Sequence, residues 1–129
     1  MSANIGLLDH YNLSTRNLSE TVRFYSEVLG LEHGWRPPLE MPGAWLYSEG
    51  HPIVHINDIS GTDRPQEYQT GPIDHVAFSS RGFAGMKAHL TGKGIEFRFN
   101  ELAGGSRWQI FLRDPNGVML ELNFDVAKE

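Results

Sequence analysis

The chain has 129 residues, of which 40% are hydrophobic and 21% charged, with no cysteine and a formal net charge of −5. This size and composition predict one soluble globular domain and argue against a disordered chain. Without cysteine there are no disulfides, thiolate nucleophiles or Cys-based metal sites, so any metal must be held by His, carboxylate or water. The acidic balance argues against nucleic acid as a partner.

Membrane insertion and export are not expected. No apolar run approaches the roughly 20 residues of a membrane-spanning helix. The first residues contain neither a basic region nor a long apolar stretch, so no signal peptide is expected. We therefore expect a cytoplasmic protein, and its six histidines are the compositional feature to follow.

The first half of the chain predicts a strand, a helix and three short strands. Residues 6–13 alternate as a strand does. Asn17 and Glu20 fit a helix-capping box, and apolar residues then follow at helical spacing until Gly30, a typical helix-ending residue. The three strands are expected at residues 31–36, 44–48 and 52–56.

The second half repeats this order after a polar linker at about residues 61–71. A strand is expected at 73–79 and a helix at 83–90. Three strands follow, at residues 95–99, 108–112 and 118–124. Each half therefore reads β-α-β-β-β, with module 1 at about 5–60 and module 2 at about 72–125 of a single domain, 1–129.

An internal repeat supports this division. The residues Asp9 and His10 recur 65 positions later as Asp74 and His75, and Ser14 and Arg16 recur likewise. Near the end of each half, the segment IVHIN matches MLELN at a distance of 66 residues. The second match makes His55 equivalent to Glu121.

Four polar residues at equivalent positions interrupt apolar strand segments: His10, His55, His75 and Glu121. A buried ionised Glu is costly unless it is paired or bound to metal. Two similar units usually pack about a pseudo-two-fold axis, so all four side chains could converge on one point. Three imidazoles and one carboxylate suit a divalent ion such as Fe, Mn, Zn, Ni or Co, which would stabilise an enolate or alkoxide.

A structural interpretation of the same residues stays open. A single strand histidine is more often a satisfied core or edge residue than a ligand. His55 in particular could orient a ligand instead of binding the ion. Asp9 and Asp74 are expected to make strand-end or inter-module hydrogen bonds, and His51 is expected to be an ordinary loop residue.

Five further residues are candidate substrate-binding groups. Arg107, Gln109 and Phe111 share one face of a predicted strand, where the first two could hold an anion near the metal. The alternative for that face is a solvated edge. Asn12 shares a strand face with His10, and Trp45 could line the pocket or pack in the core. The pair Gly104-Gly105 predicts a lid or a plain hairpin loop.

The sequence resembles the vicinal oxygen chelate superfamily, also called glyoxalase/bleomycin resistance/dioxygenase. The resemblance extends over about residues 6–124. It rests on His10 in the opening strand, on the four segments NLSETVRFY at 17–25, VLGL at 28–31, IDHVA at 73–77 and FLRDPNG at 111–117, and on the following Glu121.

The resemblance implies an α+β fold of two tandem βαβββ modules, whose strands form an open barrel-like mixed sheet around a divalent metal. It implies the ligands His10, His55, His75 and Glu121. It also implies a homodimer, with the site built within one chain or across two.

Departures from the family patterns separate the possible reactions. Glyoxalase I enzymes carry Glu in place of His55, and fosfomycin thiol transferases carry Thr in place of Asn12. Extradiol dioxygenases use two His and one Glu on Fe(II), the set that His10, His75 and Glu121 match. Bleomycin-binding members lack the metal ligands.

We therefore expect a metal-dependent enzyme that acts on a small oxygen-chelating substrate. Ring-cleaving dioxygenation and glyoxalase-type isomerisation are the first choices, and fosfomycin-type thiol or group transfer is the next. A non-enzymatic drug-binding protein is the alternative from another class. Glu121 or a metal-bound water is the candidate base. The sequence leaves the substrate and the native metal open.

Overall fold

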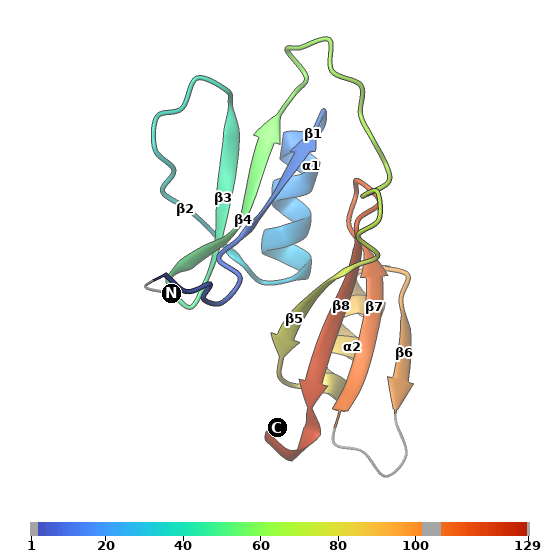
Figure 1. The fold of residues 1–129 in the computed structure, drawn as a ribbon. Helices are drawn as coiled ribbons and strands as arrows, with labels where there is room; N and C mark the ends of the chain where they lie inside the picture. The colour runs from blue at the N-terminus through green and yellow to red at the C-terminus, as the bar shows by residue number, and fades with distance from the viewer. Residues whose placement is uncertain (1–2, 102–106, 129) are drawn as a thin grey trace. The chain divides into compact units, whose positions relative to one another are not determined.

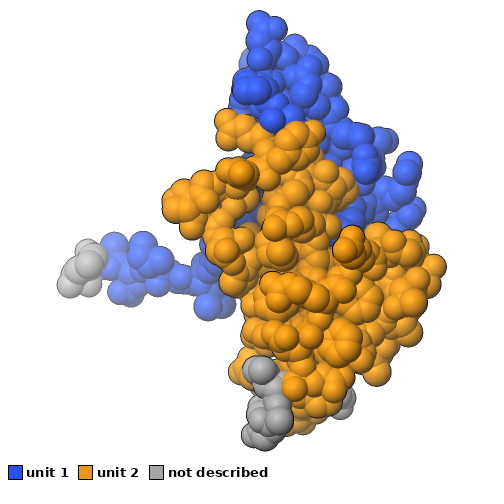
Figure 2. Space-filling model, turned by 90° about the vertical axis from the view of Figure 1, so that its right-hand side faces the viewer, with its two compact units in different colours: residues 1–66 blue, residues 67–129 orange. Residues whose placement is uncertain are grey.

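The computed structural model describes residues 3–101 and 107–128. The chain divides into two compact units, Met1–Gln66 and Glu67–Glu129 (Figure 2). The boundary falls inside the segment that the sequence predicted as a linker. No helix in the described part of the chain is long and apolar enough to cross a membrane.

Unit 1 is a four-stranded mixed sheet with one helix (Figure 1). Its strands lie in the order β1-β4-β3-β2, with β1 parallel to β4 and the other neighbours antiparallel. The helix α1 continues into one π-helical turn, η1. The elements are β1 (Tyr11–Thr15), α1 (Leu18–Arg23), η1 (Phe24–Val28), β2 (Glu32–Gly34), β3 (Gly43–Ser48) and β4 (His51–Asp58).

Unit 2 repeats this topology (Figure 1). Its strands lie in the order β5-β8-β7-β6, with β5 parallel to β8. The elements are β5 (Val76–Ser80), α2 (Phe83–Gly92), β6 (Arg98–Glu101), β7 (Arg107–Arg113), β8 (Met119–Asp125) and a 3-10 turn, η2 (Val126–Lys128). The predicted α+β fold of two βαβββ modules is confirmed, and neither four-stranded sheet is closed.

Each helix covers one face of its own sheet. In unit 1 the Thr21 hydroxyl of α1 lies 3.3 Å from that of Thr15 in β1. In unit 2 the Phe83 ring of α2 packs edge-on against Trp108 and Phe124, with centroid distances of 5.0 and 5.4 Å. Because side chains alternate along a strand, the residues between these core positions lie on the opposite side, which we call the helix-distal face.

The sequence placed the first strand of each module too early. The predicted strands at 6–13 and 73–79 begin instead at Tyr11 and Val76. The ladder of β1 starts where Tyr11 meets Val54 of β4, so the preceding residues lie outside it. Leu7 is 99% exposed, and the apolar alternation there does not reflect burial.

The helix of unit 1 begins as predicted but changes pitch. The Asn17 side chain accepts a hydrogen bond from the Glu20 amide. The Glu20 carboxylate in turn accepts from the Asn17 side chain, and not from its backbone as in a capping box. The Leu29 amide donates to Phe24 five residues earlier, which gives a π-helical turn, and Gly30 follows with φ 76°.

Candidate metal centre

In unit 1 two of the predicted ligands lie against each other. His10 immediately precedes β1, and His55 belongs to β4. Their rings are stacked at a centroid distance of 3.7 Å and an interplanar angle of 12°. Trp45 of β3 stacks on His55 at 4.0 Å and 13°, on the opposite ring face because one face cannot hold both rings. The three rings form a continuous stack.

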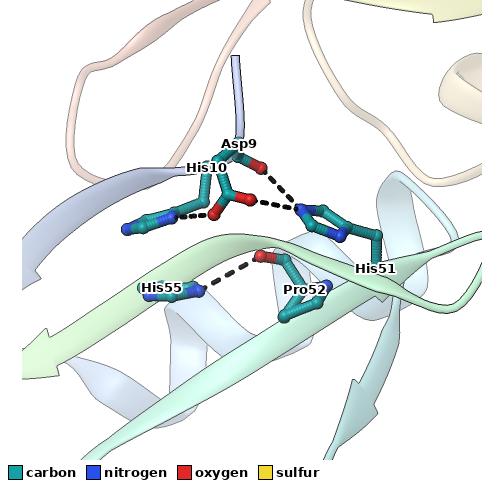
Figure 3. A network of polar contacts seen from close by, with 5 residues as sticks. All are labelled: Asp9, His10, His51, Pro52 and His55. Atoms are coloured by element: carbon teal, nitrogen blue, oxygen red, sulfur yellow. Dashed lines mark hydrogen bonds and ion pairs between the residues drawn. The ribbon is translucent and has the colours of Figure 1, made fainter. Parts of the chain in front are cut away.

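Hydrogen bonds orient both imidazoles of this pair (Figure 3). His10 Nδ1 lies 2.6 Å from Asp9 Oδ2, and His55 Nε2 lies 3.1 Å from the Pro52 carbonyl oxygen. The pKa of Asp9 lies below its usual value, chiefly because of the hydrogen bond with His10. In their neutral forms, His10 therefore offers Nε2 and His55 offers Nδ1 to a ligand.

Unit 2 brings together the other two predicted ligands. His75 Nδ1 lies 2.8 Å from Asp74 Oδ2, so the Asp-His arrangement of unit 1 is repeated. His75 Nε2 lies 3.4 Å from Glu121 Oε1, and the Glu121 side chain is only 9% exposed. Two ligand atoms on one Zn²⁺-like ion, each about 2.1 Å from it, lie roughly 3.0–3.4 Å apart. The spacing of this pair therefore fits a divalent ion.

The structure thus pairs His10 with His55 and His75 with Glu121, each pair within one unit. Among residues 3–101 and 107–128, no group of three or more His, Asp or Glu side chains is arranged to hold a metal ion. The sharing of one ion by the two pairs stays a prediction. The donor set suits a divalent metal, because an Asp carboxylate beside a His ring fixes the tautomer of metal-binding histidines.

Three of the candidate substrate-binding residues lie beside the predicted ligands on the helix-distal faces. Asn12 and Trp45 flank His55 on neighbouring strands, and Asn12 Oδ1 accepts a hydrogen bond from Asn57 at 3.1 Å. Trp45 is half-buried on this face, where its ring stacks on His55. Phe111 pairs with Glu121, and its ring meets His75 edge-on at 6.3 Å.

The other two candidates lie further along β7. Gln109 pairs with Asn123, and its side-chain oxygen accepts a hydrogen bond from Asn100 at 3.2 Å. Arg107 pairs with Asp125 and is exposed. Their common face is confirmed, but both are further than Phe111 from Glu121. The predicted Gly104-Gly105 loop lies outside the described residues.

Sequence reasoning missed three kinds of contact at these pairs. Asp9 and Asp74 bind the adjacent histidines, which their identity in the repeat could have indicated. His51, expected in a loop, is the first residue of β4 and contacts Asp9. Arg98 of β6 lies over the Phe111 ring at 4.3 Å, and no sequence signal marked it.

Burial gives His55 a testable pH signature. Its pKa lies below 6.5, chiefly because of desolvation and secondarily because of nearby His10. The folded state therefore binds this proton more weakly than the unfolded state. The resulting stability is fully present above the unfolded pKa and is lost as the pH falls toward the lower folded pKa.

We expect metal-free protein to lose thermal stability from about pH 7.5 to about pH 5.5, and His55→Gln to lose less over that interval. Thermal unfolding at a series of pH values measures this. The exposed residue His33 of β2 supplies the control, because His33→Gln should keep the wild-type pH dependence. The same change of melting temperature with pH in wild type and His55→Gln would contradict the expectation.

Comparison with known families decides the relationship. The family model of the Glyoxalase/Bleomycin resistance protein/Dioxygenase superfamily matches residues 7–122. The chain belongs to this superfamily. The resemblance inferred from the sequence motifs is therefore confirmed over nearly the whole chain.

A curated relative comes from Arabidopsis thaliana. The protein named Glyoxylase I 4 is 29% identical over 119 residues, which cover 89% of this chain and 68% of the relative. This match indicates similarity to a protein named for glyoxalase I.

Solved structures of the superfamily share the fold. A glyoxalase family protein from Bacillus anthracis matches with a TM-score of 0.77 and 22% identity, over 97% of this chain and 99% of that one. A fosfomycin resistance protein from Listeria monocytogenes matches with a TM-score of 0.73 and 17% identity, over 94% of both chains. A lactoylglutathione lyase from Agrobacterium tumefaciens matches with a TM-score of 0.66 and 16% identity, over 97% of this chain and 98% of that one. At these identities the matches show the fold alone.

Proposed function

We propose that this protein is a divalent-metal-dependent enzyme of the glyoxalase type that acts on a small substrate with two neighbouring oxygen atoms. The proposal rests on the Asp-His pair that both modules contain. In each module an Asp-His dipeptide precedes the first strand, with the carboxylate on Nδ1 of its own histidine. This arrangement leaves Nε2 of each ring for an ion, as in carboxylate–histidine–metal sites.

In this proposal His10, His55, His75 and Glu121 hold the ion, and the two modules act as one functional domain. A bound divalent ion supplies Lewis-acid stabilisation of a developing oxyanion. The proposed ion is Fe, Mn, Zn, Ni or Co.

Glu121 is the proposed base of the reaction. It removes a proton from the substrate carbon beside the chelating oxygens and returns it after electron rearrangement. Its low exposure favours this role, because few water molecules compete for the carboxylate. A carboxylate that also binds the ion must detach from it to accept the proton.

The substrate contacts follow from the helix-distal faces. Trp45 presents a flat apolar surface beside His55, and Asn12 adds an amide on its other side. On the second module Phe111 carries the Arg98 guanidinium on its ring. Stacking leaves the edge of a guanidinium available to a carboxylate. An anionic group on the substrate is therefore proposed to lie toward Arg98, with Gln109 and Arg107 further along the same strand.

Ring-cleaving dioxygenation is the second candidate. Two histidines and one carboxylate are the ligand set of non-haem Fe(II) oxygenases, and His10, His75 and Glu121 supply that set. His55 would then act beside the ligands, consistent with its stacked position between His10 and Trp45.

The test begins with metal content. The purified protein is analysed for metals, stripped with a chelator, and reloaded under anaerobic conditions with Ni, Zn, Co, Mn or Fe(II). We expect near-stoichiometric metal and turnover of a hemithioacetal that the chelator abolishes. The substrate panel includes anionic and neutral hemithioacetals, catechols, and an epoxide with a thiol.

Other results would redirect or refute the proposal. Oxygen uptake on catechols with Fe(II) would favour dioxygenation, and product from the epoxide would favour thiol transfer. A protein that retains no metal but binds a planar apolar drug tightly would refute the enzyme proposal in favour of sequestration.

We also propose that the protein is a cytoplasmic homodimer. Light scattering in solution tests the oligomeric state.

A further inference from the structure

The backbone ladder does not hold His10. Pairing between β1 and β4 begins at Tyr11, one residue later. Before it, Leu8 is 80% exposed. The direction of the His10 ring therefore depends on side-chain contacts, which are its stack on His55 and its hydrogen bond to Asp9.

Asp9 cannot orient His10 unless it is itself held, because it belongs to the same segment outside the ladder. His51 holds it (Figure 3). His51 Nε2 lies 3.0 Å from the Asp9 carbonyl oxygen and 3.1 Å from Asp9 Oδ1. One ring N–H therefore meets both the backbone and the carboxylate of Asp9. His51 is the first residue of β4, where it pairs with Ser48, so it belongs to the sheet.

The described residues of the second module show no such contact. Asp74 and His75 repeat the first pair, but Gly117 stands where the 66-residue repeat places the equivalent of His51. The Asp74 side chain is 91% exposed, compared with 66% for Asp9. Among the described residues, a second histidine that contacts the aspartate is therefore found in the first module and not in the second.

We propose that His51 is a positioning residue for the metal centre. Its Nε2–H fixes Asp9, and Asp9 keeps the proton of His10 on Nδ1, so that His10 Nε2 faces the ion. The inference rests on the proposed function for its metal-binding consequence. The effect on the His10 tautomer does not depend on a bound metal.

The experiment compares His51→Ala, His51→Gln and wild type. Loss of a group that directly supports a ligand costs about 10–100-fold in metal affinity. Because His51 acts through Asp9, we expect a loss of about 3–10-fold in His51→Ala. His51→Gln should recover most of the affinity, because its amide N–H can donate to Asp9. Calorimetric titration with Ni²⁺ or Zn²⁺ measures these values.

The second readout is nitrogen NMR of metal-free protein. We expect His10 to carry its proton on Nδ1 in wild type and His51→Gln, and to shift toward the Nε2-protonated tautomer in His51→Ala. His33→Ala is the matched control, since it removes an exposed histidine from the same unit and should change neither readout.

Two results would overturn the inference. One is an unchanged His10 tautomer and metal affinity in folded His51→Ala. The other is a His51→Gln variant no better than His51→Ala, which would assign the loss to the imidazole and not to its hydrogen bond. If wild type binds no metal, the proposed function fails, while the tautomer measurement still decides the role of His51.

Discussion

Replacing His75 by alanine is expected to abolish metal retention and leave the fold intact. His75 precedes β5, and its side chain is 37% exposed, so the change opens no core cavity. Removal of an ion ligand should cost more than the roughly 100-fold upper range for an outer partner. Thermal unfolding should stay cooperative, with a loss of stability limited to that of the contact with the buried Glu121 carboxylate. Elemental analysis, calorimetric titration and thermal unfolding measure these outcomes.

The control for this variant comes from the same unit. His89 is exposed on α2, and His89→Ala should retain the wild-type metal content. Full retention of metal by His75→Ala would count against the ligand assignment. A mixture of His75→Ala with His10→Ala adds information. Recovery of metal binding after subunit exchange would indicate a centre built across two chains, and no recovery would indicate one built within a chain.

Replacing Glu121 by glutamine is expected to lower both turnover and metal affinity. The amide has nearly the same shape as the buried carboxylate, so the surrounding packing should be kept. The amide cannot accept the substrate proton, and loss of a positioned base costs about 10²–10⁴-fold in rate. The measurement is kcat at increasing metal concentration, because saturating metal corrects for the lost ligand but not for the lost base.

Glu101 supplies the matched control. It lies exposed in β6 of the same unit and pairs with Lys87 at 3.3 Å. Because a surface ion pair contributes at most about 1 kcal/mol, Glu101→Gln should keep both metal affinity and kcat. Full recovery of kcat in metal-saturated Glu121→Gln would leave Glu121 as a ligand alone. Unchanged rate and affinity would exclude both roles.

The repeat made the fold and the ligand pairs predictable from the sequence. Both halves bury one sheet face under one helix, so their apolar positions recur at a constant spacing. Alternation in 108–112 separated the buried Ile110 and Leu112 from Gln109 and Phe111 on the opposite face. The same spacing matched His55 with Glu121, and the structure places each beside the histidine that precedes the first strand of its unit.

Features that depend on pairing between distant residues were not predictable. The first residue of β1 is set by where β4 can pair with it. The apolar residues before Tyr11 have the alternating pattern of a strand, but they are exposed. The contact between His51 and Asp9 joins residues 42 positions apart. Arg98 reaches Phe111 only through the register of β6 on β7.

Gly117, which occupies the position equivalent to His51 in the repeat, makes the two halves differ in the residues that they can accept there. Gly117 has φ 86°, and a Cβ there would lie 3.1 Å from the Tyr68 carbonyl oxygen. A histidine at this position would be strained by its backbone as well as crowded. An equivalent of His51 in the second module would therefore carry a backbone strain that His51 itself does not bear. A histidine that contacts the aspartate is more costly in the second half of the chain than in the first, so the two halves differ in the substitutions that they tolerate at this position.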